Sequence, residues 1–343
     1  MKKKERFNDA VNYSNRAFDS GFRADHIPDT PVYATHDGEE VFMTVLPYNG
    51  TPVSEIEKSF DEVDFAVIEE MGRSKYLSSL QAYQFVRFRG LTVQRQGIRN
   101  RLDKMMRLRL IREYELKAPE ADRGLKIYDL DHKGFQIARR RGVIFHKGNQ
   151  YLSNTKKQDL DQFDASEDIK RILVGNMIVL GSLMNGAACE RFGIMETMRP
   201  NQELPITDGC ILRTAANIQI DEESLLLYEV VRSTPRGMRK LADKVNRYYT
   251  LISDSRYHEN NYYGYKAIPQ LVLCGESYEH CVKIDQYLRG KGLISEADSL
   301  LYTEDLFYVQ QTLQTLYELD EAGTRTWYSL PKRQMAADME WSA

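Results

Sequence analysis

Apolar residues recur every three to four positions along two neighbouring segments, and this period predicts two amphipathic helices. The first segment opens at Leu77–Leu80, where serines precede the apolar series and act as a helix N-cap signal. The Arg89–Thr92 stretch then interrupts the period, which predicts a turn. A longer helix follows, and its apolar positions are Ile98, Leu102, Met105 and Ile111.

Alternating apolar and polar residues come directly after the longer helix, and a two-residue period predicts strands. The two strands are Ile111–Leu116 and Leu125–Leu130, and the polar residues 118–124 between them predict a hairpin turn.

Further helices are expected on both sides of these elements. Residues 59–72 carry an apolar period, and Asp131 is placed to cap a short helix over Lys133–Arg141. The order helix, helix, turn, helix, hairpin is that of a winged helix-turn-helix domain. We place this domain at residues 56–145.

Cationic and amide side chains lie between the apolar positions of the longer helix. In a helix-turn-helix, the second helix enters the major groove, where Arg suits guanine and Asn or Gln suits adenine. A cationic helical face is more often only a solvated face, but its place in this motif favours DNA binding. The predicted DNA-binding residues are Thr92, Gln94, Arg95, Gln96, Arg99, Asn100, Arg101 and Lys104 on the helix, with Arg123 and Lys126 on the hairpin.

An N-terminal arm, residues 1–55, precedes this domain. Residues 31–35 and 41–46 are apolar and flank an Asp-Gly pair, a pattern that predicts a β-hairpin. No chemistry is assigned to the arm, which is expected to pack against a neighbouring domain or a second subunit.

The second half of the chain follows an α/β pattern, and we place that domain at residues 165–330 after a mixed loop. The near-continuous apolar run 224–231 predicts a central strand. Three glycines on the first helix predict close packing against a sheet, at Gly175, Gly181 and Gly186. The predicted helices are 167–185, 235–253, 278–291 and 303–318, and the other strands are 208–213 paired with 216–220, then 270–274 and 299–302.

Composition and charge limit the class of protein. A chain of 343 residues exceeds what one core normally supports, which agrees with two domains. The net charge is only −3, so any affinity for nucleic acid must come from a local patch. The sequence holds no apolar run long enough for a membrane span and no leader, and we expect a cytoplasmic protein without a membrane partner. Its four cysteines form no C-x-x-C pair, so a structural zinc site is not expected.

Two acidic residues of the second half lie at the ends of predicted strands. Asp208 begins a strand and Glu229 ends the following one, while Lys244 and Tyr248 lie on the next helix. This order resembles the core of the PD-(D/E)xK nuclease fold. In active members two such acids bind Mg²⁺, and a lysine two residues after the second acid polarises the attacking water. Here Val231 stands at that lysine position, and valine cannot hydrogen-bond water.

The resemblance therefore implies an inactive domain with no catalytic residue, in which Asp208, Glu229 and Lys244 are remnant positions. No cofactor is expected beyond weak Mg²⁺ binding at Asp208 and Glu229. Two alternatives stay open. A lysine on the helix, Lys240 or Lys244, replaces the missing one, or the acids are structural and Glu229 pairs with Arg232 or Lys244.

Taken together, a winged helix-turn-helix domain followed by an α/β nuclease-like domain resembles the replication-relaxation family of plasmid and conjugative-element proteins. The similarity covers roughly residues 75–318 and rests on Leu77–Arg141 and on Tyr228–Val231 with Lys244 and Tyr248. It implies a double-stranded DNA-binding accessory or regulatory protein of a mobile element, whose second domain serves dimerisation or contact with an element-encoded protein. The alternatives are a Mg²⁺-dependent nuclease or nickase, and an element- or phage-encoded inhibitor of a host protein.

Overall fold

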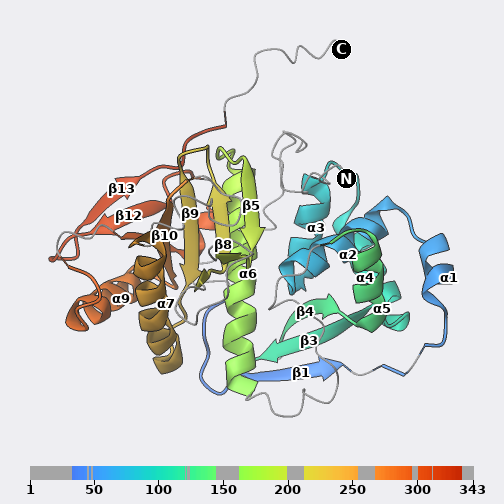
Figure 1. Ribbon diagram of the computed structural model, residues 1–343. Coiled ribbons are helices and arrows are strands. Elements are labelled where there is room, and N and C mark those ends of the chain that lie inside the picture. Colours follow the sequence, from blue (N-terminus) through green and yellow to red (C-terminus); the bar gives the residue numbers. More distant parts are fainter. Residues whose placement is uncertain are drawn as a thin grey trace, which may run out of the picture.

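Helices pack on two separate sheets in this mixed α/β chain (Figure 1). The computed structural model describes residues 33–44, 46–47, 49–119, 121, 124–143, 162–198, 212–253, 267–295, 300–310 and 312–333. No helix in these ranges is both long and apolar enough to cross a bilayer.

A four-stranded antiparallel sheet and a group of helices make up the first half. The sheet has the order β1-β3-β4-β2. Its strands are β1 (Glu40–Thr44), β2 (Leu77–Ser78), β3 (Ile111–Lys117) and β4 (Leu125–Leu130). The helices are α1 (Val53–Lys58), α2 (Glu62–Ser74), α3 (Ser79–Phe88), α4 (Arg95–Arg107) and α5 (His132–Arg140).

Short polar side chains fix where three of these helices begin. Ser78 accepts a hydrogen bond from the Gln81 backbone and starts α3, as the sequence predicts. Asp131 caps α5, also as predicted. Asp61 and Asp64 form a reciprocal capping box at the start of α2, so the helix predicted over residues 59–72 is confirmed but begins at Glu62. The short helix α1 precedes it and was not predicted. The hairpin of β3 and β4 is confirmed.

The predicted N-terminal hairpin is wrong. Residues 33–36 form no strand, and β1 pairs antiparallel with β3, from Glu40 opposite Lys117 to Thr44 opposite Glu113. The apolar residues of β1 favour a strand but do not specify its neighbour, and β1 pairs with the outer edge of β3. The strand therefore widens the sheet of the first half.

A seven-stranded sheet forms the second half, in the order β13-β12-β11-β10-β9-β8-β5. Strands β9, β10 and β11 are parallel, and the other neighbours are antiparallel. The central strand β9 is buried along its whole length, as its apolar run predicts. The strands are β5 (Arg191–Ile194), β8 (Ala216–Gln219), β9 (Leu225–Val230), β10 (Pro269–Gly275), β11 (Leu301–Glu304), β12 (Leu316–Leu319) and β13 (Arg325–Tyr328).

Helices cover both faces of this sheet. Leu226 and Tyr228 of β9 lie in one core cluster with α6 (Gln162–Met184). Leu225 and Leu227 lie in the other, with α7 (Pro235–Ser253) and α9 (Tyr278–Gly290). The elements of this sheet therefore begin, in chain order, with helix α6, the antiparallel strands β5, β8 and β9, the crossover helix α7 and the parallel strand β10.

Two other predictions for the second half are wrong. The predicted strands 208–213 and 216–220 do not pair with each other in their described parts. Instead β7 (Leu212–Arg213) pairs with β6 (Thr197–Met198), and β8 lies between β5 and β9. The predicted helix 303–318 is a short 3₁₀ turn, η6 (Asp305–Tyr308), followed by β12. Strand β12 pairs with β11, and β13 then extends the sheet.

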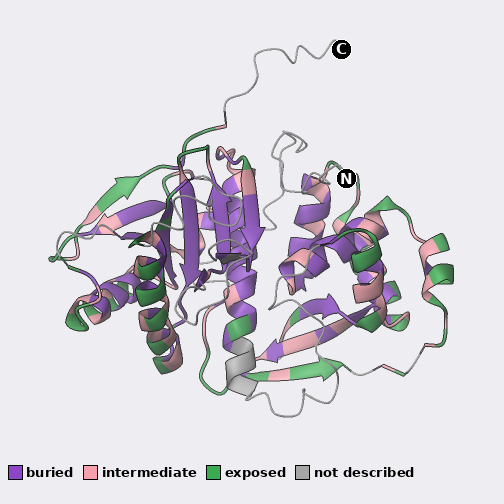
Figure 2. Cartoon of the chain, in the orientation of Figure 1, coloured by how far each residue is buried: buried purple, intermediate pink, exposed green. Residues whose placement is uncertain are grey.

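Helix α6 packs against both halves of the protein, and it is buried along most of its length (Figure 2). A Cβ atom at Gly175 would lie 2.7 Å from the carbonyl oxygen of Ala215, so the predicted close packing is confirmed there. On its other side, Gln81 of α3 donates to the Leu173 carbonyl at 2.7 Å, and Asn176 donates to the Tyr76 carbonyl at 2.8 Å. One hydrophobic core consequently runs from the first half through α6 to the large sheet.

Candidate functional site

The N-terminal half of α4 presents polar side chains to solvent. Helix α4 begins at the N-cap Gln94, which makes no side-chain capping bond. Gln96 donates to Asn100 at 3.0 Å along the helix surface. The exposed members of the predicted DNA-binding set are Thr92, Gln94, Gln96, Arg99, Asn100 and Lys104, and Arg95 is half-buried.

Two cations of the same helix point toward α2 instead. Arg101 forms ion pairs with Asp61 at 2.6 Å and with Asp64 at 2.7 Å. The Lys104 ammonium lies 3.7 Å from Asp64 and above the ring of Phe60. Their charges are therefore engaged in holding α4 against the start of α2. Their predicted contact with DNA stays a prediction.

The hairpin supplies one described residue of the predicted set. Lys126 on β4 is 57% exposed and pairs with Glu113 of β3 at 3.0 Å. Arg123 lies outside the described residues. The structure therefore brings Arg95, Arg99 and the amides together on α4, with Lys126 on the separate hairpin.

In the second half, Glu229 and Lys244 form an ion pair, as expected in the alternative in which the acids are structural. Glu229, at the end of β9, receives Arg171 of α6 in a bidentate pair, Nε to Oε1 at 2.9 Å and Nη2 to Oε2 at 2.8 Å. Lys244 of α7 donates to the same Oε1. Asp208 lies outside the described residues, and Arg232, the other expected partner of Glu229, pairs with Asp305.

This cluster does not fit Mg²⁺. A hard cation needs free oxygen lone pairs, whereas both Glu229 oxygens already hold cationic side chains. No group of three or more His, Cys, Asp or Glu side chains in the described ranges could hold a metal ion. Val231 is buried in the core shared with α7. Burial, together with the nearby Arg171, lowers the pKa of Lys244 to about 7.

We expect Lys244→Met to remove part of the pH dependence of stability. The folded pKa of about 7 lies below the ordinary value of 10.5, so the unfolded chain binds more protons between these pH values. The free energy of unfolding of the wild type should therefore rise as pH increases from about 7 toward 10.5, and urea denaturation at several pH values measures this slope. Lys240→Met is the matched control, at a half-buried lysine one turn before Lys244 on α7 that pairs with Asp168 of α6. Equal slopes in wild type and Lys244→Met would contradict the assignment.

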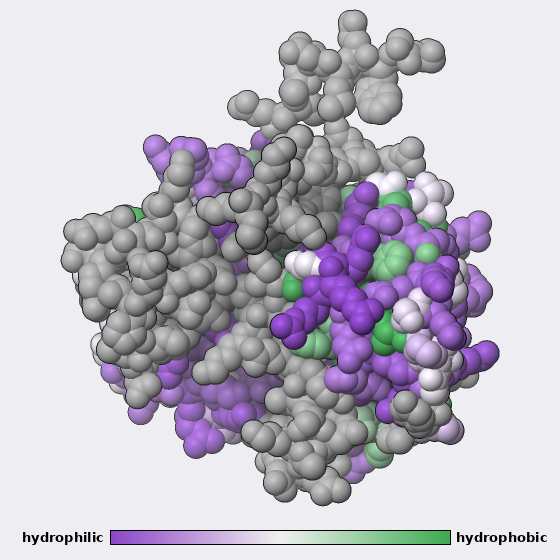
Figure 3. All heavy atoms as spheres, turned by 45° about the vertical axis from the view of Figure 1, so that its right-hand side comes forward, coloured by the Kyte–Doolittle hydropathy of each residue, from purple (hydrophilic) through white to green (hydrophobic). Residues whose placement is uncertain are grey.

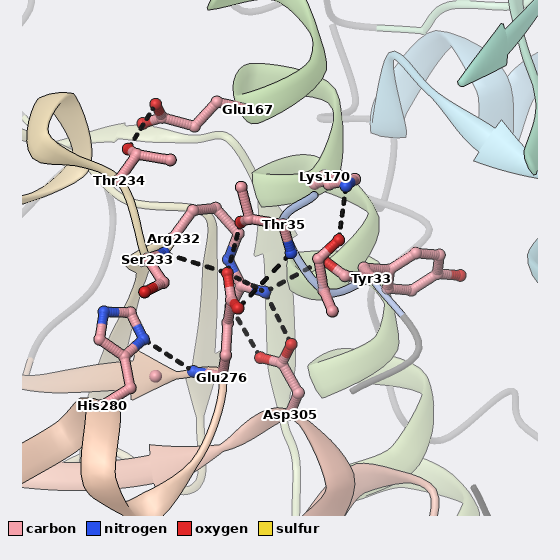
Figure 4. A network of polar contacts seen from close by, with 12 residues as sticks. Tyr33, Thr35, Glu167, Lys170, Arg232, Ser233, Thr234, Glu276, His280 and Asp305 are labelled. Carbon is pink, nitrogen blue, oxygen red and sulfur yellow. Dashed lines mark hydrogen bonds and ion pairs between the residues drawn. The ribbon is translucent and has the colours of Figure 1, made fainter. Parts of the chain in front are cut away.

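A second group of polar residues lies where the three parallel strands end, and the sequence analysis did not single it out (Figure 4). Arg232 follows β9, Glu276 follows β10 and Asp305 follows β11. Arg232 is 1% exposed and forms a bidentate pair with Asp305, at 2.7 and 2.8 Å. We call Arg232, Glu276 and Asp305 the polar centre. Its sequence signal is a charged residue one or two positions after the end of a largely buried strand.

The Glu276 carboxylate of the polar centre is held by the chain itself. It accepts hydrogen bonds from the Ser233 backbone at 3.0 Å and from the Thr35 hydroxyl at 2.5 Å. The Glu276 backbone donates to Nδ1 of His280 at 3.1 Å. The carboxyl ends of parallel strands are a frequent ligand position in α/β folds, and here the N-terminal segment with Thr35 occupies it.

We expect His280→Gln to flatten the loss of stability in acid. Burial lowers the pKa of His280 to about 4, so the unfolded chain takes up its proton first as pH falls. The contribution of His280 is complete above the ordinary value of 6.5 and is lost as pH falls toward 4. Thermal unfolding between these pH values should separate the variant from wild type, whereas the change at exposed His132, His132→Gln, should not.

No protein-family model, curated protein or solved structure matches the chain.

Proposed function

We propose that the chain binds double-stranded DNA through α4, as an accessory or regulatory protein. The observation that carries this proposal is the exposed N-terminal half of α4, with Gln96, Arg99 and Asn100 on one surface. The order α2, β2, α3, α4, β3, β4 supports a winged helix-turn-helix, because β2 pairs with β4 and closes the sheet behind the helices. In that motif the N-terminal residues of the second helix contact base edges.

The far end of α4 supports the same orientation. Asn49 donates to the Arg107 carbonyl at 3.0 Å, and Arg109 donates to the Leu46 carbonyl. The N-terminal segment thus covers the C-terminal end of the helix. A duplex would approach the opposite half of α4. Where Figure 3 colours this side of the molecule, the surface is mostly hydrophilic with a few apolar side chains.

The chemistry of this surface favours base reading over general phosphate binding. Arg99 has the donors that guanine accepts, and Gln96 and Asn100 have the paired donor and acceptor that adenine requires. Asp61 and Asp64 neutralise Arg101 and draw Lys104 toward α2, and the whole chain has a net charge of −3. We therefore propose sequence-specific binding to duplexes with adenine and guanine in neighbouring positions.

Selection from a random pool of duplexes tests this proposal. The protein should enrich one short motif, and the enriched duplex should bind more tightly than a shuffled one at the same salt concentration. A pool that stays random after several rounds would refute sequence-specific binding.

We further propose that the second half is a nuclease-like fold that does not cut DNA and serves dimerisation or partner contacts. The order α6, β5, β8, β9, α7, β10 supports the likeness to the nuclease core and, with the first half, to the replication-relaxation family. The engaged carboxylate of Glu229 and the apolar Val231 support the lack of activity.

We expect no cleavage of supercoiled plasmid with Mg²⁺ or Mn²⁺. The reason is that Glu229 cannot take a metal while Arg171 and Lys244 hold its oxygens. Plasmid nicking followed on agarose gels measures the activity, with Glu229→Ala tested in parallel for intact DNA binding. Metal-dependent nicking that this substitution abolishes would make the protein an enzyme and refute the second proposal.

A further inference from the structure

Residues 33–44 connect the polar centre of the second half to the sheet of the first half. We call these residues the strap. We infer that the strap couples the two halves, so that loosening its Thr35 end at the polar centre loosens β1 at its other end. The consequence for DNA affinity rests on the proposed function, whereas the coupling itself does not.

The first end of the strap is bound by groups that follow the parallel strands (Figure 4). The Thr35 hydroxyl donates to Glu276 at 2.5 Å, and Arg232 donates to the Tyr33 carbonyl at 3.4 Å. Tyr33 is 5% exposed, and it lines one small cavity together with Gln81 of α3 and Met177 of α6. Tyr33 therefore contacts both halves of the protein at once.

A single ammonium group joins the two ends of the strap. Lys170 of α6 donates to the Ala34 carbonyl at 2.5 Å and forms an ion pair with Glu39 at 2.7 Å. Both side chains of that pair are at most 5% exposed, and burial lowers the pKa of Lys170. Because Ala34 precedes Thr35 and Glu39 precedes β1, a displacement at Thr35 reaches β1 through one side chain.

The second end of the strap is a short edge strand. In the described ranges β1 has β3 as its one strand neighbour, with five residue pairs. Phe42 and Met43 are 48% and 38% exposed, so apolar burial gives this strand little support. An edge strand of this kind opens locally at low cost unless its ends are fixed, and here the buried Lys170–Glu39 pair fixes one of them.

Opening of β1 has a consequence for the hairpin. It would uncover the outer edge of β3, the strand that follows α4 and forms the hairpin with β4. A looser hairpin must be ordered when DNA binds, and that ordering lowers affinity. Through the strap, the polar centre thus controls how well ordered the hairpin is before DNA binds.

Amide hydrogen exchange of the full chain tests the coupling. In Thr35→Val, which removes the hydroxyl and keeps the shape, the amides of β1 and of residues 113–117 should exchange about tenfold faster, the size expected for loss of one hydrogen bond to a charged group. Affinity for a selected duplex should fall about fivefold as the less ordered hairpin binds. Thr35→Ser, which keeps the hydroxyl, should behave as wild type.

Two further variants make the outcome decisive. Glu276→Gln removes the charge from the other partner of the bond and should accelerate the same amides. Thr326→Val makes the same chemical change on the exposed edge strand β13 and should accelerate neither β1 nor residues 113–117. Unchanged exchange of β1 in Thr35→Val and Glu276→Gln would overturn the coupling, and faster exchange with unchanged affinity would overturn its role in DNA binding. A wild type that binds no duplex would refute the proposed function and leave the exchange test intact.

Discussion

Arg99→Ala should weaken binding to a selected duplex by about tenfold to a hundredfold, the loss expected for one bidentate contact to guanine. Arg99 is exposed on the open half of α4 and makes no ion pair within the described residues, so its donors are free to meet a base. Fluorescence anisotropy with a labelled duplex measures the change. Arg239→Ala, at an exposed arginine on α7 that likewise lacks a described ion pair, is the matched control and should bind as wild type.

The salt dependence of the same variants separates base reading from phosphate binding. Loss of one phosphate contact flattens the slope of log K against log salt by about 0.9. Arg99→Lys keeps the charge but cannot make the bidentate contact, so it should lose preference at one base position and retain the slope. Removing Arg95 together with Arg99 should lower affinity further. Unchanged affinity of that double variant, with its fold intact by circular dichroism, would refute the role of α4.

Asp305→Ala should lower the free energy of unfolding by about 3–5 kcal/mol, the cost of leaving one charge of a buried pair without its partner. Asp305 is fully buried and its two oxygens hold the guanidinium of Arg232, which is itself 1% exposed. Urea denaturation gives the change. Replacement of both, as Arg232→Met with Asp305→Leu, should recover much of the loss because neither charge of this pair is then left buried without the other.

An exposed ion pair supplies the comparison. Glu62→Ala removes a carboxylate that is 62% exposed and lies 3.4 Å from Arg141, and such surface pairs contribute at most about 1 kcal/mol. If Asp305→Ala costs no more than Glu62→Ala, the polar centre is not a buried ion pair in solution.

Local patterns predicted the elements whose stability depends on neighbouring residues. The serine before α3, the aspartate before α5 and the alternation of β3 and β4 each specify their element, because capping and period are short-range properties. The uniformly apolar run of β9 likewise predicted a central strand.

Errors arose where the partner is distant in the chain. The pattern of β1 suits a strand but does not say that β3, about seventy residues later, supplies the neighbour. The segment 303–318 was predicted to be a helix. Instead, β11 ends before Asp305, which pairs with Arg232, and the chain then forms a 3₁₀ turn and the antiparallel strand β12.

For the candidate sites too, the sequence predicted which residues are exposed but not which distant residues they contact. The position of Arg99 on an exposed helical face follows from the period of α4. The engagement of Arg101 with Asp61 and of Glu229 with Arg171 depends on how helices pack, which no spacing in the sequence expresses. The predicted charge of α4 was therefore larger than the charge that α4 presents.

The contact between α3 and α6 has a practical consequence for anyone who wishes to dissect or re-engineer the chain. The Gln81 side chain accepts a hydrogen bond from the backbone amide of Ser78, the N-cap of α3, and its amide nitrogen donates to the Leu173 carbonyl of α6. A fragment that ends after α5 would leave this amide and the apolar face around Leu80 in water, and would be prone to aggregate. A transplant of α3 and α4, the helices of the proposed DNA-binding surface, should therefore include α6, because one hydrophobic core joins the three helices.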